Sequence, residues 1–130
     1  MTQFEPTVAD LLGRGVTVRF QASGDSMHPS IRSGEHVHVA PVEWSSLRAG
    51  DVVLARAKRG LTAHRLVNIT AGTATTRGDN ARQRDATVPK TAILGRITHI
   101  ERDGATVAVP AARRVRRILL SLSQLIRSLV

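Results

Sequence analysis

Short segments that alternate apolar and polar residues recur along most of this chain, separated by turns such as Gly34-Glu35 and Gly50-Asp51. Strands of this length, broken at short intervals by turn residues, are typical of all-β domains. The pattern predicts a mainly β fold, a compact barrel or sandwich. The expected strands are Val16 to Phe20, His36 to Val39, Asp51 to Ala57, Leu61 to Thr70, Ala74 to Arg77, Ile93 to Ile100 and Thr106 to Val109.

The two ends of the chain depart from this β pattern. Thr7 to Leu12 is expected to form a short helix that begins after Pro6 and ends at Gly13. After Pro110, apolar residues recur at steps of three and four, and arginine, serine and glutamine occupy the opposite positions, as in an amphipathic helix. We therefore divide the 130 residues into one domain, 1–110, and a basic amphipathic helix, 111–130.

The positive charge is concentrated in the expected second helix. The chain has a formal net charge of +9, and residues 113–130 carry five arginines and no acid. This helix either packs on the domain or a partner, or lies on an anionic membrane surface with its arginines at the headgroups. With one Trp, two Phe and no Tyr, the chain lacks the aromatic platform that stacks single-stranded nucleic acids, so no nucleic-acid partner is expected.

The sequence contains no cysteine, which excludes disulfides and thiolate metal sites. It has no apolar run long enough to span a membrane, and its first ten residues lack the features of a secretory signal. We therefore expect a cytoplasmic protein, peripheral to the membrane if the second helix binds lipid. His36 and His38 point to one side of a strand, but no third ligand is evident, so neither a metal nor another cofactor is predicted.

A candidate nucleophile, Ser26, lies where the chain must leave a strand. Gly24 permits a positive φ or a close approach to a substrate, and Pro29 cannot continue a strand ladder. Met27 is flexible and suits an apolar floor beside the serine. Gly-Asp-Ser is also a common sequence in ordinary turns. The serine therefore indicates a catalytic site only if the chain also supplies a base and an acid for it.

A serine hydroxyl is a weak nucleophile until a base takes its proton, and His64 is the candidate base. If residues 61–69 form one strand, His64 shares a face with Thr62, Leu66 and Asn68, and the more apolar set of Leu61, Ala63, Val67 and Ile69 shares the other face with Arg65. The histidine is therefore expected to face a cleft. Asp79 and Asp85 are both candidates for the acid that orients it.

Taken in this order, these segments resemble the signal peptidase I family, from about Phe20 to Arg102. The likeness rests on Ser-Met-His-Pro at 26–29, His-Arg at 64–65, and Thr-Arg-Gly-Asp-Asn at 76–80 with a second acid six residues after the first. Histidine followed by arginine is similar to the endoplasmic-reticulum and archaeal type and to some Gram-positive sporulation members, whereas bacterial-type members carry lysine. The resemblance implies nucleophile Ser26, base His64, triad acid Asp85 with Asp79 as a supporting or alternative acid, and substrate contacts from Gly24, Met27 and Pro29.

The chain also departs from the family that it resembles. Members normally have an N-terminal membrane anchor, and this sequence has none. Many have a serine two residues before the nucleophile that helps to form the oxyanion hole, and here that position is Gly24. The hole would then depend on backbone N–H groups, including that of Ser26, with help from Ser23.

These residues predict a serine endopeptidase that cleaves an extended signal or leader peptide paired to a sheet edge, after small residues. One alternative is a cytoplasmic maturation protease for a peptide precursor. Self-cleaving LexA-type repressors share Gly-Asp-Ser-Met, but they use a lysine base and an upstream Ala-Gly or Cys-Gly bond, and neither occurs at a suitable position. The remaining alternative is a catalytically inactive peptide-binding module on the same fold.

Overall fold

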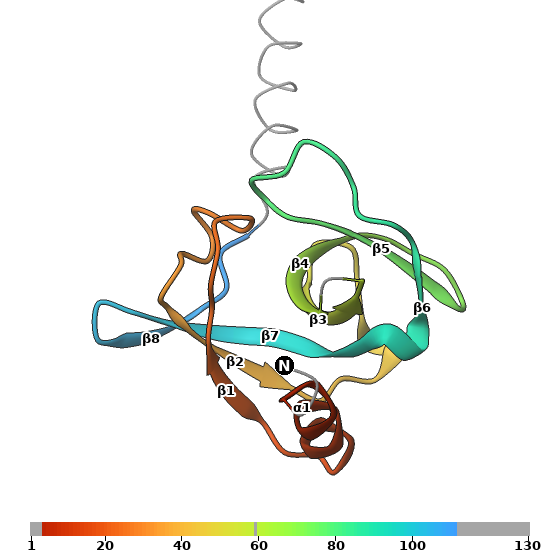
Figure 1. The fold of residues 1–130 in the computed structure, drawn as a ribbon, viewed down its shortest axis with the longest axis horizontal. Helices are drawn as coiled ribbons and strands as arrows, with labels where there is room; N and C mark the ends of the chain where they lie inside the picture. The colour runs from red at the N-terminus through yellow and green to blue at the C-terminus, as the bar shows by residue number, and fades with distance from the viewer. Residues whose placement is uncertain (1–3, 59, 112–130) are drawn as a thin grey trace, which may run out of the picture.

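A computed structural model describes residues 4–58 and 60–111, in which a curled antiparallel sheet forms a half-barrel beside one short helix (Figure 1). The sheet has the strand order β1-β2-β7-β3-β4-β5-β6, and β8 pairs with β7. Its longer strands are β3 (Val52–Ala57), β4 (Gly60–Ile69), β5 (Thr73–Arg77) and β7 (Ile93–Arg102). The shorter ones are β1 (Val18–Gln21), β2 (His36–Ala40), β6 (Val88–Pro89) and β8 (Ala105–Ala108).

Strand β7 joins the two parts of the sheet. One edge pairs with β2, from Glu101 opposite His36 to Arg96 opposite Ala40. The other edge pairs with β3 in its first half and with β8 in its second half. Because β7 pairs along both edges, it carries β1 and β2 to one side and β3 to β6 to the other.

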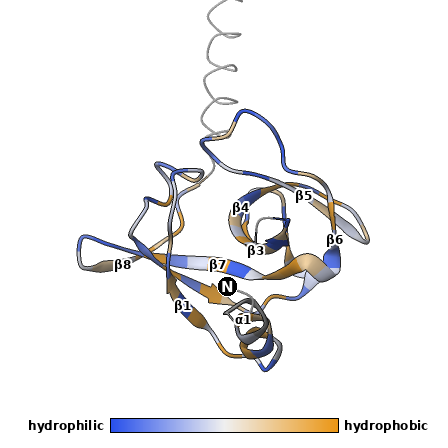
Figure 2. Cartoon of the chain, in the orientation of Figure 1, coloured by the Kyte–Doolittle hydropathy of each residue, from blue (hydrophilic) through white to orange (hydrophobic). Residues whose placement is uncertain are grey.

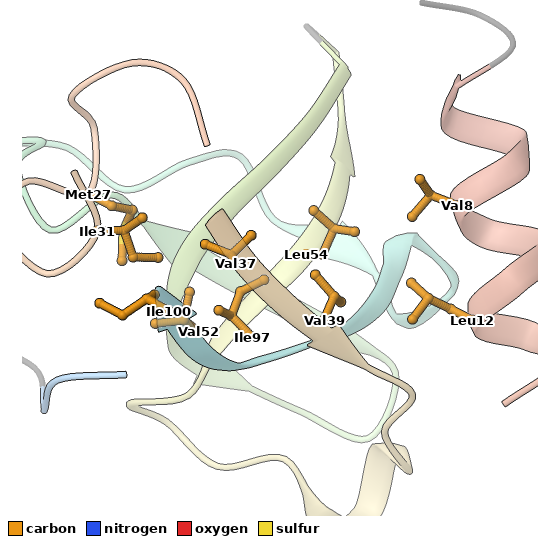
Figure 3. Packing of buried hydrophobic residues seen from close by; sticks show 10 residues of the cluster. All are labelled: Val8, Leu12, Met27, Ile31, Val37, Val39, Val52, Leu54, Ile97 and Ile100. Atoms are coloured by element: carbon orange, nitrogen blue, oxygen red, sulfur yellow. The ribbon is translucent and has the colours of Figure 1, made fainter. Parts of the chain in front are cut away.

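The larger hydrophobic core lies between helix α1 (Phe4–Gly13) and the inner faces of β2, β3 and β7. Figure 3 shows its side chains extending from Val8 and Leu12 on the helix to Met27 and Ile31 at the far end. The last two residues belong to the loop that contains Ser26, so this loop is an integral part of the core. The remaining members are Val37, Val39, Val52, Leu54, Ile97 and Ile100.

A smaller core lies on the opposite face of β3 and consists of Leu47, Val53, Leu66 and Ala74. Successive strand residues point to opposite faces, so Val53 enters this cluster while Val52 and Leu54 enter the larger one. In Figure 2 the strands carry both apolar and hydrophilic colours, whereas the β5–β6 and β7–β8 connections are mainly hydrophilic. Because Val53 is buried on one face of β3 and Val52 and Leu54 on the other, β3 is a central strand of the molecule.

The mainly β fold and the N-terminal helix are confirmed, and each strand expected from the sequence is present with its ends shifted by a few residues. Sequence patterns did not indicate β6 or the two 3₁₀ turns, Trp44–Ser46 and Lys90–Ala92. A strand of two residues that includes a proline gives no alternation to detect. The predicted helix 111–130 lies outside the described residues except for its first position.

The expected division of β4 into two faces holds only for its first half. The pairing with β5 shifts between Leu66 and Asn68, which is the signature of a β-bulge. One extra residue reverses the alternation, so Ile69 packs in the smaller core with Leu66 and not on the side of Ala63. Within the described part of the chain, no helix is long and apolar enough to cross a membrane.

The packing predicts that two paired residues of β7 and β8 contribute very differently to the free energy of unfolding. Ile100 is fully buried and its register partner Val107 is 39% exposed. Ile100→Ala should lower the free energy of unfolding by about 2 to 5 kcal/mol, because it leaves a cavity in the larger core. Val107→Ala, the matched control, should change it by no more than about 0.5 kcal/mol. Chemical denaturation measures both, and equal losses would contradict this account of the core.

Candidate active site

Ser26 lies in the loop of residues 22–35 that connects β1 to β2, here called the serine loop. Two of its apolar side chains, Met27 at 4% and Ile31 at 3% exposure, are inserted into the larger core. Gly24 has a φ of +85°, a conformation that glycine adopts without strain, and its N–H donates to the Ser33 hydroxyl at 3.2 Å. The two buried anchors therefore fix the loop, and the turn at Gly24 leads into the serine.

A second attachment holds the middle of the serine loop to β7. The Arg102 guanidinium donates to both oxygens of Glu35 and to the backbone carbonyls of Pro29 and Ser30, at 3.2 and 3.1 Å. The hydrogen bond from Arg102 lowers the pKa of the Glu35 carboxyl below its ordinary value and outweighs the effect of burial. Glu35 thus stays ionised and keeps Arg102 directed at the loop backbone.

A continuous hydrogen-bond chain joins Ser26, His64 and Asp85. The Ser26 Oγ is 3.0 Å from His64 Nε2, and His64 Nδ1 is 2.6 Å from Asp85 Oδ2. A neutral imidazole has one N–H, and the carboxylate acceptor places that proton on Nδ1. Nε2 is then free to accept the proton of the serine hydroxyl, which is the arrangement required of a general base.

The segment 78–87, here called the acid loop, is fastened directly to the serine loop. The N–H of Asn80 donates to the Ser26 carbonyl at 2.8 Å, and its side-chain amide donates to the Asp25 carbonyl at 3.1 Å. At Gly78, an added Cβ would lie 2.6 Å from the Ser26 carbonyl oxygen and 3.3 Å from His64 Nε2. Only a residue without a side chain allows this approach of the two loops.

The second acid, Asp79, belongs to a different cluster. Its carboxylate accepts hydrogen bonds from Arg65 at 2.7 and 3.1 Å and from the Ser30 hydroxyl at 2.7 Å, and the Arg65 and Asp79 side chains are each 6% exposed. Burial acts to raise the pKa of Asp79, but the hydrogen bonds from Arg65 and Ser30 outweigh it and the pKa is lowered. Of the two acids, only Asp85 contacts His64 among the residues that the structure describes.

A groove of about 510 Å³ opens beside Ser26 and His64. It lies between the start of β4 and the outer strand β1, whose one partner among the described strands is β2. β5 pairs with β4 only from Arg65 onward, so the preceding residues of β4 have one unpaired edge among the described strands. Beyond Ser26 and His64, the lining consists of Phe20, Gln21, Ala22, Ser23, Gly24, Met27, Ile31, Leu54, Leu61, Thr62 and Ala63.

The other sequence-predicted residues fall into two groups. Ser23, Gly24 and Met27 line the groove, whereas Pro29 is not among its described lining residues and accepts the hydrogen bond from Arg102. His38 contacts Glu101 on the outer face of the sheet, at 2.7 Å. Among residues 4–58 and 60–111, no cluster of three or more His, Cys, Asp and Glu side chains is arranged to hold a metal ion.

Sequence reasoning missed the residues that hold the site together. Thr76, whose hydroxyl donates to Asp85 at 2.7 Å, is an ordinary strand threonine in the sequence. Arg102 and Glu35 are 67 residues apart, and no local pattern connects them. Gly78 lies inside the recognised Thr-Arg-Gly-Asp-Asn stretch, which could have indicated a close backbone approach.

The Arg65–Asp79 pair predicts a specific loss of stability in acid. A carboxyl whose pKa is lower in the folded than in the unfolded state adds stability that is present above the unfolded value, ordinarily 3.8, and is lost as the pH falls through the folded value. Asp79→Asn should therefore remove part of the acid-induced loss. At neutral pH it should cost about 3 to 5 kcal/mol, because a buried arginine loses its partner.

Denaturant unfolding of the natural chain and of Asp79→Asn between pH 7 and pH 2 measures both effects. Glu35 and Glu101 also have lowered pKa values, so the variant should keep a shallower acid dependence and not become flat. Identical acid dependence in the two proteins would contradict this role for Asp79.

Comparison with known proteins assigns most of the chain to one family. A comparison with curated proteins gives no match. The model of the Peptidase S24-like family matches residues 6–98, which includes the serine loop, β4, the acid loop and most of the sheet. Because the match covers well over half of the 130 residues, the chain belongs to the Peptidase S24-like family and has a serine peptidase-like fold.

Proposed function

We propose that this chain is a serine endopeptidase in which Ser26 is the nucleophile, His64 the general base and Asp85 the acid that orients the base. The observation that carries the proposal is the hydrogen-bond chain from Ser26 Oγ through His64 to Asp85, at 3.0 and 2.6 Å beside an open groove. Membership of a serine peptidase family supports the same reaction class. Triads are recognised by this geometry and not by sequence position.

In the proposed reaction, His64 Nε2 takes the Ser26 proton while Oγ bonds to the scissile carbonyl carbon. The imidazolium so formed faces the Asp85 carboxylate, which stabilises its charge. When the C–N bond breaks, the same proton passes to the leaving amine and an acyl ester remains on Ser26. Water then attacks the ester with His64 again as base, which releases the acid and returns the proton to Oγ.

The oxyanion of the tetrahedral intermediate needs donors close to Ser26. The N–H of Ser26 donates to no acceptor within the described residues, so it is available for this role. Ser23 lines the same groove and supplies a hydroxyl where the family pattern has its serine one residue later. The loss of one oxyanion donor costs about 10²- to 10³-fold in kcat in a well-studied enzyme, so reliance on this substitute predicts modest turnover.

The groove favours an extended peptide as substrate. Outer strand β1 and the unpaired edge of β4 offer backbone groups on both sides of it, so a peptide strand can pair with the sheet. Its floor of Met27, Ile31 and Leu54 is apolar. Together with the resemblance to the histidine type of signal peptidase I, this supports a signal or leader peptide, cut at an apolar segment with small residues before the bond.

The sequence supports three further proposals. A cytoplasmic maturation protease would use the same site on a peptide precursor, and an inactive peptide-binding module would use only the groove. Attachment to an anionic membrane through residues 111–130 rests on their amphipathic pattern and arginines. Labelling of the serine separates an enzyme from a binding module.

A fluorophosphonate probe, which reacts only with an activated serine, should label the natural chain on Ser26. Ser26→Ala should abolish labelling, and His64→Ala should reduce peptide cleavage on the order of 10⁶-fold, as in other triads. The double variant should lose no more than the single ones, because nucleophile and base act as one unit. Mass spectrometry of the labelled peptide and cleavage of a peptide library provide the measurements.

Labelling of a residue other than Ser26, or equal labelling of Ser26→Ala, would contradict the assignment of the nucleophile. A natural chain that is folded, binds peptides and is not labelled would indicate the binding module.

The contact of Gly78 with the serine loop predicts that a side chain at this position lowers the reactivity of Ser26. In Gly78→Ala, the new methyl group must push the Ser26 carbonyl away from its 2.6 Å position. A displacement of about 1 Å in a catalytic group can cost about 10²-fold, so we expect a loss of that order in the labelling rate. Gly72→Ala is the matched control, because its added Cβ meets nothing within 4 Å. Equal labelling rates in the two variants would contradict this role for Gly78.

A further inference from the structure

We propose that Thr76 is a positioning residue for the triad, whose hydroxyl holds the Asp85 carboxylate against His64. This inference rests on the proposed function, since it concerns the acid of that triad. The Thr76 Oγ1 donates to Asp85 Oδ2 at 2.7 Å, and this is the same oxygen that lies 2.6 Å from His64 Nδ1. The N–H of Asp85 also donates to the Thr76 carbonyl at 2.8 Å. One strand residue thus fixes both the backbone and the side chain of the acid.

Asp85 needs such a partner because, among the described residues, its carboxylate has hydrogen bonds only with Thr76 and with His64 itself. It belongs to the acid loop between β5 and β6, and its side chain is 38% exposed, whereas that of His64 is 13% exposed. An aspartate in water samples several rotamers and exchanges its hydrogen bonds with solvent. Two donors on one carboxylate oxygen leave a single orientation in which that oxygen faces the imidazole.

Thr76 is well placed to impose this orientation. It is 5% exposed and pairs in register with Leu66 of β4, which is 1% exposed and lies two residues after His64. A β-branched side chain has a restricted χ1, so the position of the hydroxyl is fixed by the strand itself. The β4–β5 pairing therefore sets the acid relative to the base, although the acid belongs to a loop.

The neighbouring threonine provides an internal comparison. Thr75 is 9% exposed, and its hydroxyl pairs with that of Thr87 at 2.7 Å, on the other side of the strand from Asp85. Removal of either hydroxyl costs a buried hydrogen bond and should lower stability by a similar amount. Only removal of the Thr76 hydroxyl should affect the acid of the triad.

The test compares Thr76→Val, Thr76→Ser and Thr75→Val, with a peptide found by library cleavage as substrate and the fluorophosphonate labelling rate as a second readout. Thr76→Val keeps the shape and removes the hydroxyl, and we expect kcat to fall by about 10²-fold with KM nearly unchanged, as for a displaced catalytic group. Thr76→Ser should recover most of the loss. Thr75→Val should lower Tm about as much as Thr76→Val does, but its kcat should stay close to that of the natural chain.

A double variant tests whether Thr76 acts through Asp85. In the Asp85→Ala background, Thr76→Val should cause no further loss of kcat, because the group that it positions is already absent. Should Thr76→Val fail to fold, Thr76→Ala takes its place in the same comparisons. The proposal would be overturned if Thr76→Val had the kcat of the natural chain, or if Thr75→Val lost as much kcat as Thr76→Val. It would also be overturned if Thr76→Ser were as slow as Thr76→Val, or if the losses from Thr76→Val and Asp85→Ala were fully additive.

A measurement without substrate separates this proposal from the proposed function. The proton between His64 Nδ1 and Asp85 Oδ2, at 2.6 Å, should give a low-field ¹H NMR signal that disappears in His64→Gln. Thr76→Ser should keep the signal and Thr76→Val should shift or broaden it, whether or not the protein cleaves peptides. An unlabelled natural chain would overturn the function alone, whereas a signal unchanged in Thr76→Val would overturn the role of Thr76 alone.

Discussion

The buried pair of Arg65 and Asp79 is the interaction on which the arrangement of this site depends. Besides Asp79, the Arg65 guanidinium donates to the backbone carbonyls of Gly50 and Pro110 and to the Ser30 hydroxyl. Removing one member of a buried pair leaves an uncompensated charge, which costs far more than the intact pair contributes. Strand β4, the serine loop, the acid loop and the end of the described domain are therefore held at one point.

This structural cluster and the proposed catalytic residues are adjacent in the chain but lie on opposite faces of β4. His64 precedes Arg65, and alternation directs the histidine to the groove and the arginine to the interior. In the acid loop, Asp79 enters the ion pair while Asp85 reaches the imidazole. The same two segments thus provide both the attachment and the chemistry, and the buried ion pair fixes the start of the acid loop relative to β4.

Much of the fold and part of the site could be predicted from residue patterns. Alternation and turn residues gave the strands, because one face of each strand is buried and the other is less so. Ser26 became the candidate nucleophile because it lies where a strand must break, and His64 the candidate base because it lies on the less apolar face of its strand. Their order also resembles that of a known family. The bulge after Leu66 was not predictable, since it depends on how β5 pairs with β4. β6 is too short to leave a pattern of its own.

The sequence by itself determined which residue types were available, a serine on a strand break, one histidine on a mixed face and two acids beyond it. Residue spacing left open which acid meets the base, because Asp79 and Asp85 lie 15 and 21 residues after His64, and only the family resemblance favoured Asp85, with Asp79 as an alternative. Tertiary structure decided this: Arg65 binds Asp79, and Thr76 directs Asp85 to His64. The physical reason is that a buried arginine requires a carboxylate, so the first acid is engaged inside the protein and the second remains for the site.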